Sequence, residues 1–211
     1  MIGFELCGTY ALNGSYLRGL MGRKAPLTTR KKLARFIGNA QGLPGREQAA
    51  RALRYICEGS ASPMETALAM ILGLPPSLGG YGIGMPQMNY KVDTVSRRLD
   101  LYQTEYRKCD LFWGPSLTVE YDGAWDHAGR EALEKDAIRR NDLFGEGIHS
   151  VTITARQIYN AELLHVRARQ IAAFLKKQIR PRAKKYPDKQ EYLRLVVLGG
   201  CSKARPPEQQ G

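Results

Sequence analysis

Residues 109–123, CDLFWGPSLTVEYDG, hold the pattern from which the fold is predicted. Two runs rich in apolar, β-branched and aromatic residues, CDLFW (109–113) and LTVEYDG (117–123), lie on either side of a Gly-Pro turn. Runs of this composition around a short turn predict a β-hairpin. We therefore place two adjacent strands here and work outward from them.

The predicted hairpin gathers three carboxylates. Glu120 and Asp122 are two residues apart on the second run, so their side chains share one face of the sheet. The short turn brings Asp110 beside them, and His127 follows five residues after Asp122. Converging carboxylates repel one another and attract a divalent cation. The alternative is ordinary: acids at this spacing are common on solvent faces, and Asp110 or Asp122 could simply begin a turn.

The flanking sequence predicts helices and further strands. Helices are expected over 28–37, 46–57, 63–72, 130–144 and 156–179, and strands over 90–96, 149–155 and 193–200. Residues 74–89 are rich in Gly and Pro and are expected to form a loop. Strands followed by alternating helices and strands predict an α/β protein, a mixed β-sheet flanked by helices on both faces.

Apolar spacing predicts which helical side chains face the core. From the first and last long helices these are Leu33, Phe36, Ile37, Leu164, Ala168, Ile171 and Leu175. Ser62 is expected to cap the helix at 63–72, with Glu65 completing a capping box. We divide the chain into a basic N-terminal helical and loop extension (1–57), a core domain (58–180) and a basic, partly disordered C-terminal tail (181–211).

Composition excludes several classes of protein. The 211 residues are 43% hydrophobic and 25% charged, which is ordinary for a globular domain. No apolar run approaches the roughly 18 residues of a membrane span, and the first residues lack the pattern of a secretory signal. Four widely spaced cysteines predict neither a zinc site nor a disulfide scaffold. We therefore expect a cytoplasmic protein with reduced thiols.

The charge distribution favours a polyanionic partner. The net charge of +12 divides into +8 over residues 1–57, −5 over 58–154 and +9 over 155–211. An enzyme that cleaves phosphodiesters with a metal needs clustered carboxylates for Mg²⁺ and cations for the backbone, so this pattern fits it. The competing interpretation is that these charges only cover a solvated surface.

A series of motifs runs from Asp110 through Glu120-x-Asp122-Gly and His127 to DAIRRN (136–141) and VTITARQI (151–158). This series resembles the PD-(D/E)xK nuclease superfamily. The closest likeness is to very-short-patch-repair endonucleases and related domains of bacterial proteins. It covers about residues 62–175 and includes the SPMET segment (62–66). The resemblance implies a restriction-endonuclease-like fold.

The resemblance also implies roles for single residues. Asp110 and Glu120 would bind the metal with Asp122 beside them, and Glu65 would present a further acidic group to the metal. His127 would carry a proton. In DAIRRN, Asp136, Arg139 and Arg140 match a pattern that contacts the scissile phosphate or forms an ion pair. Each residue has a plainer alternative: Glu65 caps its helix, the arginines are solvated or ion-paired, and His127 ends the strand. Trp113 and Trp125 are expected to pack in the core or its rim, with insertion between bases as the alternative.

One departure from the family pattern concerns position 122. The superfamily usually has lysine where this chain has Asp122, and such a lysine stabilises developing charge. Lys135, Lys91 or Lys108 could substitute, or His127 could remove the need. The change could also mark a member that keeps the fold without the chemistry.

Two functions therefore remain open. The first is a Mg²⁺- or Mn²⁺-dependent endonuclease that cleaves DNA, with RNA not excluded. The second is an inactive nuclease-fold module that binds DNA or regulates a partner in a defence or toxin–antitoxin setting; either could act as a homodimer or with a partner protein. The residues expected to bind nucleic acid are Arg30, Lys31, Lys32, Lys135, Arg139, Arg140, Arg167, Lys176 and Lys177.

Overall fold

The two runs around the Gly-Pro turn form the expected hairpin. The computed structural model describes residues 1–11, 21–98, 101–123, 130–179 and 185–199. Its main sheet has the strands β3 (Gln87–Arg98), β4 (Leu101–Trp113), β5 (Leu117–Asp122) and β6 (His149–Thr154). Their order is β3-β4-β5-β6, antiparallel except that β6 runs parallel to β5. The strands expected over 90–96 and 149–155 are thus confirmed.

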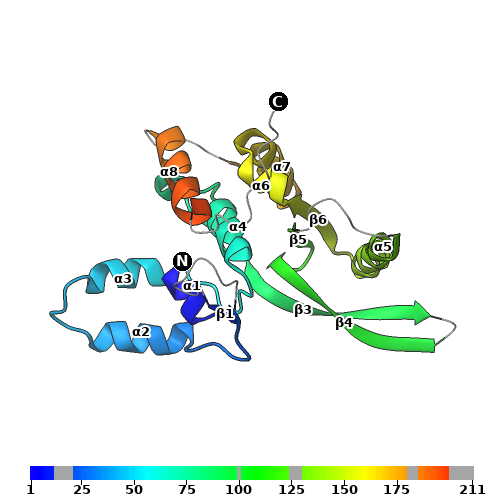
Figure 1. Ribbon diagram of the computed structural model, residues 1–211, viewed down its shortest axis with the longest axis horizontal. Helices are drawn as coiled ribbons and strands as arrows, with labels where there is room; N and C mark the ends of the chain where they lie inside the picture. The colour runs from blue at the N-terminus through cyan, green and yellow to red at the C-terminus, as the bar shows by residue number, and fades with distance from the viewer. Residues whose placement is uncertain (12–20, 99–100, 124–129, 180–184, 200–211) are drawn as a thin grey trace.

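β3 and β4 extend beyond the other strands as a two-stranded arm (Figure 1). They pair from Gln87–Phe112 out to Arg98–Leu101, whereas β4 pairs with β5 only over three residues next to the turn. The long arm leaves the acidic part of β5 near the point where the β4–β5 pairing ends.

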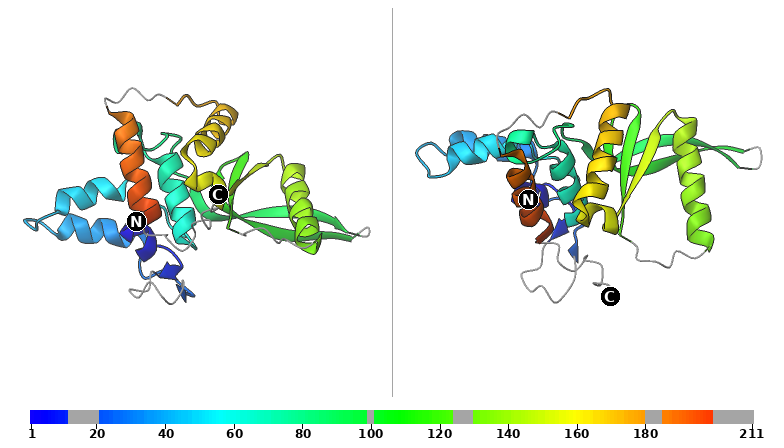
Figure 2. Two further views of the ribbon diagram at one scale, coloured as in Figure 1. Left: turned by 45° about the horizontal axis from the view of Figure 1, so that its top comes forward. Right: turned by 90° about the horizontal axis from the view of Figure 1, so that it is seen from above.

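Helices cover both faces of the sheet. They are α1 (Ile2–Leu6), α2 (Arg30–Asn39), α3 (Arg46–Leu53), α4 (Pro63–Gly73), the 3-10 helix η1 (Pro76–Leu78), α5 (Arg130–Gly145), α6 (Ala155–Tyr159), α7 (Ala161–Phe174) and α8 (Tyr186–Gly199). Leu111 joins a large core built with α4, α7 and α8, while the next residue, Phe112, joins a smaller core with Leu143 of α5. Successive strand residues point to opposite faces, so the expected α/β class, a mixed sheet flanked by helices, is confirmed. Figure 2 shows α5 beside the β3–β4 arm and the other core helices at the opposite end. The helices in the described ranges are too short or too polar to cross a membrane.

The start of α4 follows the sequence signals. Ser62 is the N-cap and its hydroxyl accepts a hydrogen bond from the Glu65 backbone N–H at 3.1 Å. The Glu65 carboxylate accepts from the backbone N–H of Ala61 at 3.0 Å rather than from that of Ser62. The capping box therefore forms with its second bond displaced by one residue.

Two predictions for the C-terminal third are wrong. The helix expected over 156–179 is broken into α6 and α7, because Thr154 and Asn160 each cap a separate helix with a side-chain hydrogen bond. Instead of the strand expected over 193–200, residues 193–199 are part of α8, whose Leu193 and Val197 lie in the large core. Residues 186–199 therefore belong to the core rather than to a tail. The tail residues 200–211 lie outside the described ranges.

The N-terminal region divides into a packed and a projecting part. Tyr10, on β1 (Tyr10–Ala11), which pairs with β2 (Met21–Gly22), is buried with its hydroxyl 3.0 Å from Thr66 of α4. Helices α2 and α3 pack on each other and project from the body (Figure 1). Neither helix has a buried residue, and Phe36 is 69% exposed. The expectation that Phe36 faces the core is wrong, because α2 packs mainly on α3 and contributes no residue to the core.

Candidate metal-binding carboxylate site

The three carboxylates of the hairpin line one cavity. Asp110 of β4, with Glu120 and Asp122 of β5, borders a cavity of about 130 Å³ that Arg140 of α5 also lines. The remaining lining residues are Tyr121, Ser150 and Thr152. The structure thus brings together three of the acids that the sequence singled out and one of the expected arginines.

Asp110 is held where the β4–β5 ladder ends. On this side the paired residues of the ladder end at Leu111 and Val119. Beyond it, the Asp110 carboxylate accepts a hydrogen bond from the backbone N–H of Tyr121 at 3.0 Å. The side chain of one strand therefore satisfies a backbone donor of the next, which fixes the carboxylate beside Glu120.

Glu120 is positioned by a buried threonine. The Thr118 hydroxyl lies 2.7 Å from the Glu120 carboxylate and 3.2 Å from the carbonyl oxygen of Leu111. Thr118 is fully buried, so its hydroxyl has no water to replace these partners. A hydroxyl carries one proton, and the shorter contact assigns it to the charged acceptor.

Glu65 lies next to this site without lining the cavity. It is buried at the start of α4. Burial is the largest cause of its raised pKa, and the negative charge of Asp110 adds to it, while hydrogen bonds from Ala61, Asn89 and Ser62 act in the opposite direction. The capping role is therefore present, together with electrostatic coupling to Asp110.

Asn89 is a residue of this region that the sequence analysis missed. Its side-chain amide donates to the Glu65 carboxylate at 2.6 Å and to the Gly59 carbonyl at 2.9 Å. Asn89 has φ 50°, a left-handed conformation that asparagine tolerates better than most residues. It lies between the pairs Met88–Leu111 and Tyr90–Cys109, in register with Asp110. The sequence placed Asn89 at the end of the loop expected over 74–89, whereas β3 begins at Gln87, so no signal in the sequence pointed to its role.

The helix that carries Arg140 is tied to the sheet by an ion pair. The Arg107 guanidinium of β4 contacts Asp142 of α5 through two nitrogens, at 2.5 and 3.1 Å. Both nitrogens donate to the same carboxylate oxygen, Oδ2, and both side chains are partly buried. This pair, also unpredicted, holds the C-terminal part of α5 over the carboxylate side of the sheet.

The donor set suits a hard cation. In the described ranges no group of three or more His, Cys, Asp or Glu side chains is arranged to hold a metal ion. Mg²⁺, however, keeps several waters and is commonly bound through only one or two carboxylates. Asp110 and Glu120, both oxygen ligands bordering one cavity, fit that requirement.

Several expected site residues are not described in full. His127 and Trp125 lie outside the described ranges. Lys135, Asp136 and Arg139 lie on α5, but their side chains are not described.

The two strand lysines lie outside the cavity. Lys91 of β3 pairs with Lys108 of β4, and its ammonium sits 4.4 Å from the centre of the Tyr106 ring. Neither residue lines the carboxylate cavity. Trp113 is buried and donates from its indole N–H to the Gly84 carbonyl at 2.8 Å, which supports packing rather than insertion between bases.

The other expected cations fall into three groups. Arg167 lines a second cavity that shares Arg140, Ser150 and Thr152 with the carboxylate cavity. Arg30 and Lys31 line another cavity, which shares no residue with the carboxylate cavity, and the Arg30 guanidinium donates to the Leu53 carbonyl at 3.1 Å. The third group is Lys32, exposed on α2, and the pair Lys176 and Lys177, exposed after α7. The structure does not gather all of them around the carboxylates.

Family models, curated proteins and solved structures were each compared with the chain. None matched. The site must therefore be interpreted from its own geometry and from the likeness stated above.

Proposed function

We propose that this protein is a Mg²⁺-dependent endonuclease acting on DNA. The observation that carries the proposal is the cavity bordered by Asp110, Glu120, Asp122 and Arg140. It combines ligands for a hard cation with a guanidinium, the side chain best suited to a phosphate. A site that binds a metal and a phosphodiester together needs both.

Four of the residues that line the cavity, Asp110, Glu120, Tyr121 and Arg140, have a part in this proposal. Asp110 and Glu120 hold the cation, and Thr118 and the Tyr121 N–H orient those two carboxylates. Mg²⁺ or Mn²⁺, when bound, supplies positive charge at the phosphate and lowers the pKa of a bound water. Arg140 contacts a phosphate oxygen of the substrate. His127 stays a candidate for moving the proton.

The choice of DNA rests on charge and on the family likeness. A net charge of +12 favours a polyanion, and the resemblance to very-short-patch-repair endonucleases favours DNA over RNA. Binding that depends on phosphate contacts weakens steeply as the salt concentration rises.

The test is cleavage of supercoiled plasmid by purified protein in Mg²⁺, Mn²⁺ or EDTA. The wild type is expected to nick or linearise the plasmid only with metal, and Asp110→Asn is expected to lose cleavage while it still binds DNA. A protein that cleaves equally in EDTA, or an Asp110→Asn variant that cleaves normally, would refute the proposal.

A second candidate is a DNA-binding module without catalysis, and Asp122 favours it. Asp122 lies in the cavity at the position where the likeness leads one to expect lysine, so the cavity gains a negative charge where a positive one is usual. A salt-sensitive gel shift without cleavage in any metal would support this candidate. Asp122→Lys then tests the cause: cleavage gained by that variant would assign the loss to position 122.

A further inference from the structure

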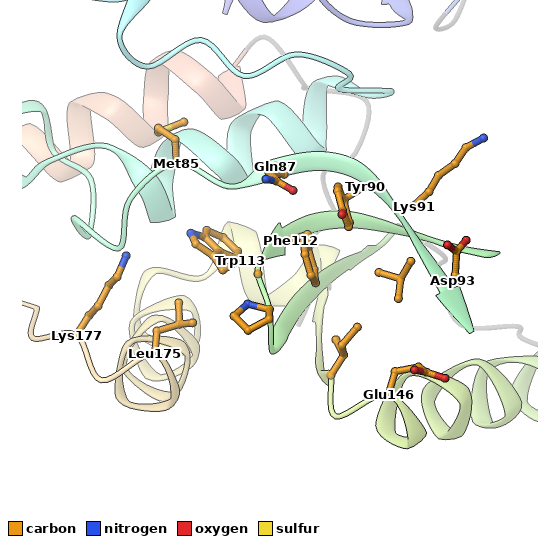
Figure 3. A pocket seen from close by; sticks show the side chains of 14 residues that line it. Met85, Gln87, Tyr90, Lys91, Asp93, Phe112, Trp113, Glu146, Leu175 and Lys177 are labelled. Atoms are coloured by element: carbon orange, nitrogen blue, oxygen red, sulfur yellow. The ribbon is translucent and has the colours of Figure 1, made fainter. Parts of the chain in front are cut away.

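A large cavity lies away from the carboxylates, along β3 and the end of α7. It has a volume of about 910 Å³ (Figure 3). A second cavity of about 800 Å³ continues it toward α2 and α3, and the two share Met85, Gln87 and Tyr90. We call the two together the aromatic groove. Tyr90 lies where its two halves meet.

The wall of the groove is aromatic at its centre. Tyr90 stacks on Phe112 with ring centres 4.6 Å apart and planes 3° from parallel, and Trp113 stands next to them (Figure 3). Phe112 and Trp113 are buried, whereas Tyr90 is 44% exposed. Tyr90 is thus a ring held flat by a buried neighbour, with surface left over for a ligand.

Cations lie at both ends of the groove. Lys91 and Lys177 lie at opposite sides of the first half (Figure 3), and Lys31 and Arg54 line the second half and are exposed. The acids that also line the groove are Asp93, Glu146 and Glu58. Glu58 accepts a hydrogen bond from the Arg30 backbone N–H, so it is engaged with the protein itself.

Aromatic rings between cations are the recognition pattern of unpaired nucleic acid, in which bases stack on the rings and phosphates meet the cations. In a duplex the faces of the bases are stacked on one another, so they cannot stack on an exposed tyrosine ring in a groove. The groove shares no lining residue with the carboxylate cavity; the link between them is Asn89, next to Tyr90 on β3, whose side-chain amide hydrogen-bonds Glu65. From these observations we infer that the aromatic groove binds a single-stranded segment of DNA, with Tyr90 as the stacking platform. The inference deepens the proposed function and rests on it for the choice of DNA.

The experiment measures binding of fluorescein-labelled oligothymidylate by anisotropy, with the full chain in EDTA. The oligonucleotide has about 12 nucleotides, within the range that single-strand sites cover. Tyr90→Ala is expected to weaken binding about tenfold, the scale of one lost base-stacking contact. Tyr90→Phe keeps the ring and should bind like the wild type. The matched control is Tyr192→Ala, because Tyr192 is 70% exposed on α8 and lines neither half of the groove.

Salt dependence separates stacking from charge. Lys31→Gln should lower the slope of log affinity against log salt by about 0.7, the amount expected for one phosphate contact on a single strand. Lys24→Gln, an exposed lysine outside the groove, should leave the slope unchanged. Tyr90→Ala should lower the affinity at every salt concentration without changing the slope. Thermal unfolding of each variant checks that its fold is retained.

The inference is overturned if Tyr90→Ala binds the oligonucleotide as tightly as the wild type, or if the wild type prefers a duplex of the same length. It is also overturned if an acidic polypeptide displaces the oligonucleotide equally well from the wild type and from Tyr90→Ala, because the groove would then bind its ligand by charge alone. Because the binding assay needs no metal, its outcome is independent of cleavage. Plasmid cleavage without groove binding refutes only this inference, and groove binding without cleavage refutes only the nuclease.

Discussion

Replacing Thr118 by valine removes one hydroxyl from beneath Glu120 and changes the side-chain shape little. The lost contact is a 2.7 Å hydrogen bond to a carboxylate, made by a fully buried donor. Hydrogen bonds to charged groups contribute about 1.5–3 kcal/mol. Without this bond Glu120 loses the restraint that Thr118 places on its orientation in the cavity that Asp110 also lines.

The expected result is a weaker response to Mg²⁺. Loss of a residue that orients a metal ligand typically costs about 10- to 100-fold in metal affinity or activity, and 1.4 kcal/mol corresponds to tenfold. The Mg²⁺ concentration for half-maximal plasmid cleavage should therefore rise at least about tenfold in Thr118→Val, while the rate at saturating Mg²⁺ falls less. The assay is initial nicking rate against Mg²⁺ concentration.

Thr66→Val is the matched control. Thr66 is also fully buried and hydrogen-bonded, but its hydroxyl lies 3.0 Å from Tyr10 and 2.8 Å from Ser60 rather than near the cavity. In urea unfolding Thr118→Val should lose about 1.5–3 kcal/mol and Thr66→Val about 0.5–1.5 kcal/mol of stability, and only Thr118→Val should change the Mg²⁺ dependence. An unchanged Mg²⁺ dependence in Thr118→Val, or an equal shift in both variants, would refute the assignment of Thr118 as the residue that positions Glu120.

Three further predictions concern the fold around the site. Val197→Ala should lower the free energy of unfolding in urea by about 2 kcal/mol, because Val197 is fully buried on α8. Val196→Ala, at a side chain that is 50% exposed, should change it by no more than about 0.5 kcal/mol. Equal effects would mean that α8 does not pack as described. Asn89→Ala and Asn89→Gly both lose the hydrogen bond to Glu65. The alanine variant should be about 1 kcal/mol less stable than the glycine variant, because residue 89 has a left-handed φ of 50° that glycine adopts more easily. Equal stabilities would contradict that conformation. Burial raises the pKa of Tyr186 to about 12 from the ordinary 10, so its contribution to stability is complete below pH 10 and is lost as the pH rises toward 12. Urea unfolding at pH 8 and pH 11 should show a larger loss in the wild type than in Tyr186→Phe, and an identical loss would exclude this cause.

The hairpin and its acids were predictable because their signals are local. The Gly-Pro turn, the β-rich runs and the two-residue spacing of Glu120 and Asp122 all act within fifteen residues. The cavity also needed Arg140, which α5 places there through the Arg107–Asp142 ion pair between segments 35 residues apart. A contact of that range leaves no periodic pattern in the sequence.

The wrong predictions came from segments decided by packing. Residues 193–200, LRLVVLGG, contain β-branched residues typical of a strand, yet residues 193–199 complete a helix whose Val197 joins the large core. The apolar spacing of α2 suggested a buried face, but none of its residues is buried, and it packs mainly on α3. Thr118 shares a strand face with Glu120, but the sequence pattern does not show that its hydroxyl is buried and turned toward that carboxylate.

The most direct test of the site is Mn²⁺ binding measured by electron paramagnetic resonance, with wild type and the Asp110→Asn and Glu120→Gln variants. If these two carboxylates form the metal site, the wild type should bind one Mn²⁺ per chain that excess Mg²⁺ displaces. Each variant should lose that binding while its urea unfolding midpoint stays near or above that of the wild type, because repulsion between the acids is relieved. Mn²⁺ bound equally well by wild type and both variants, or not bound by the wild type at all, would contradict the assignment.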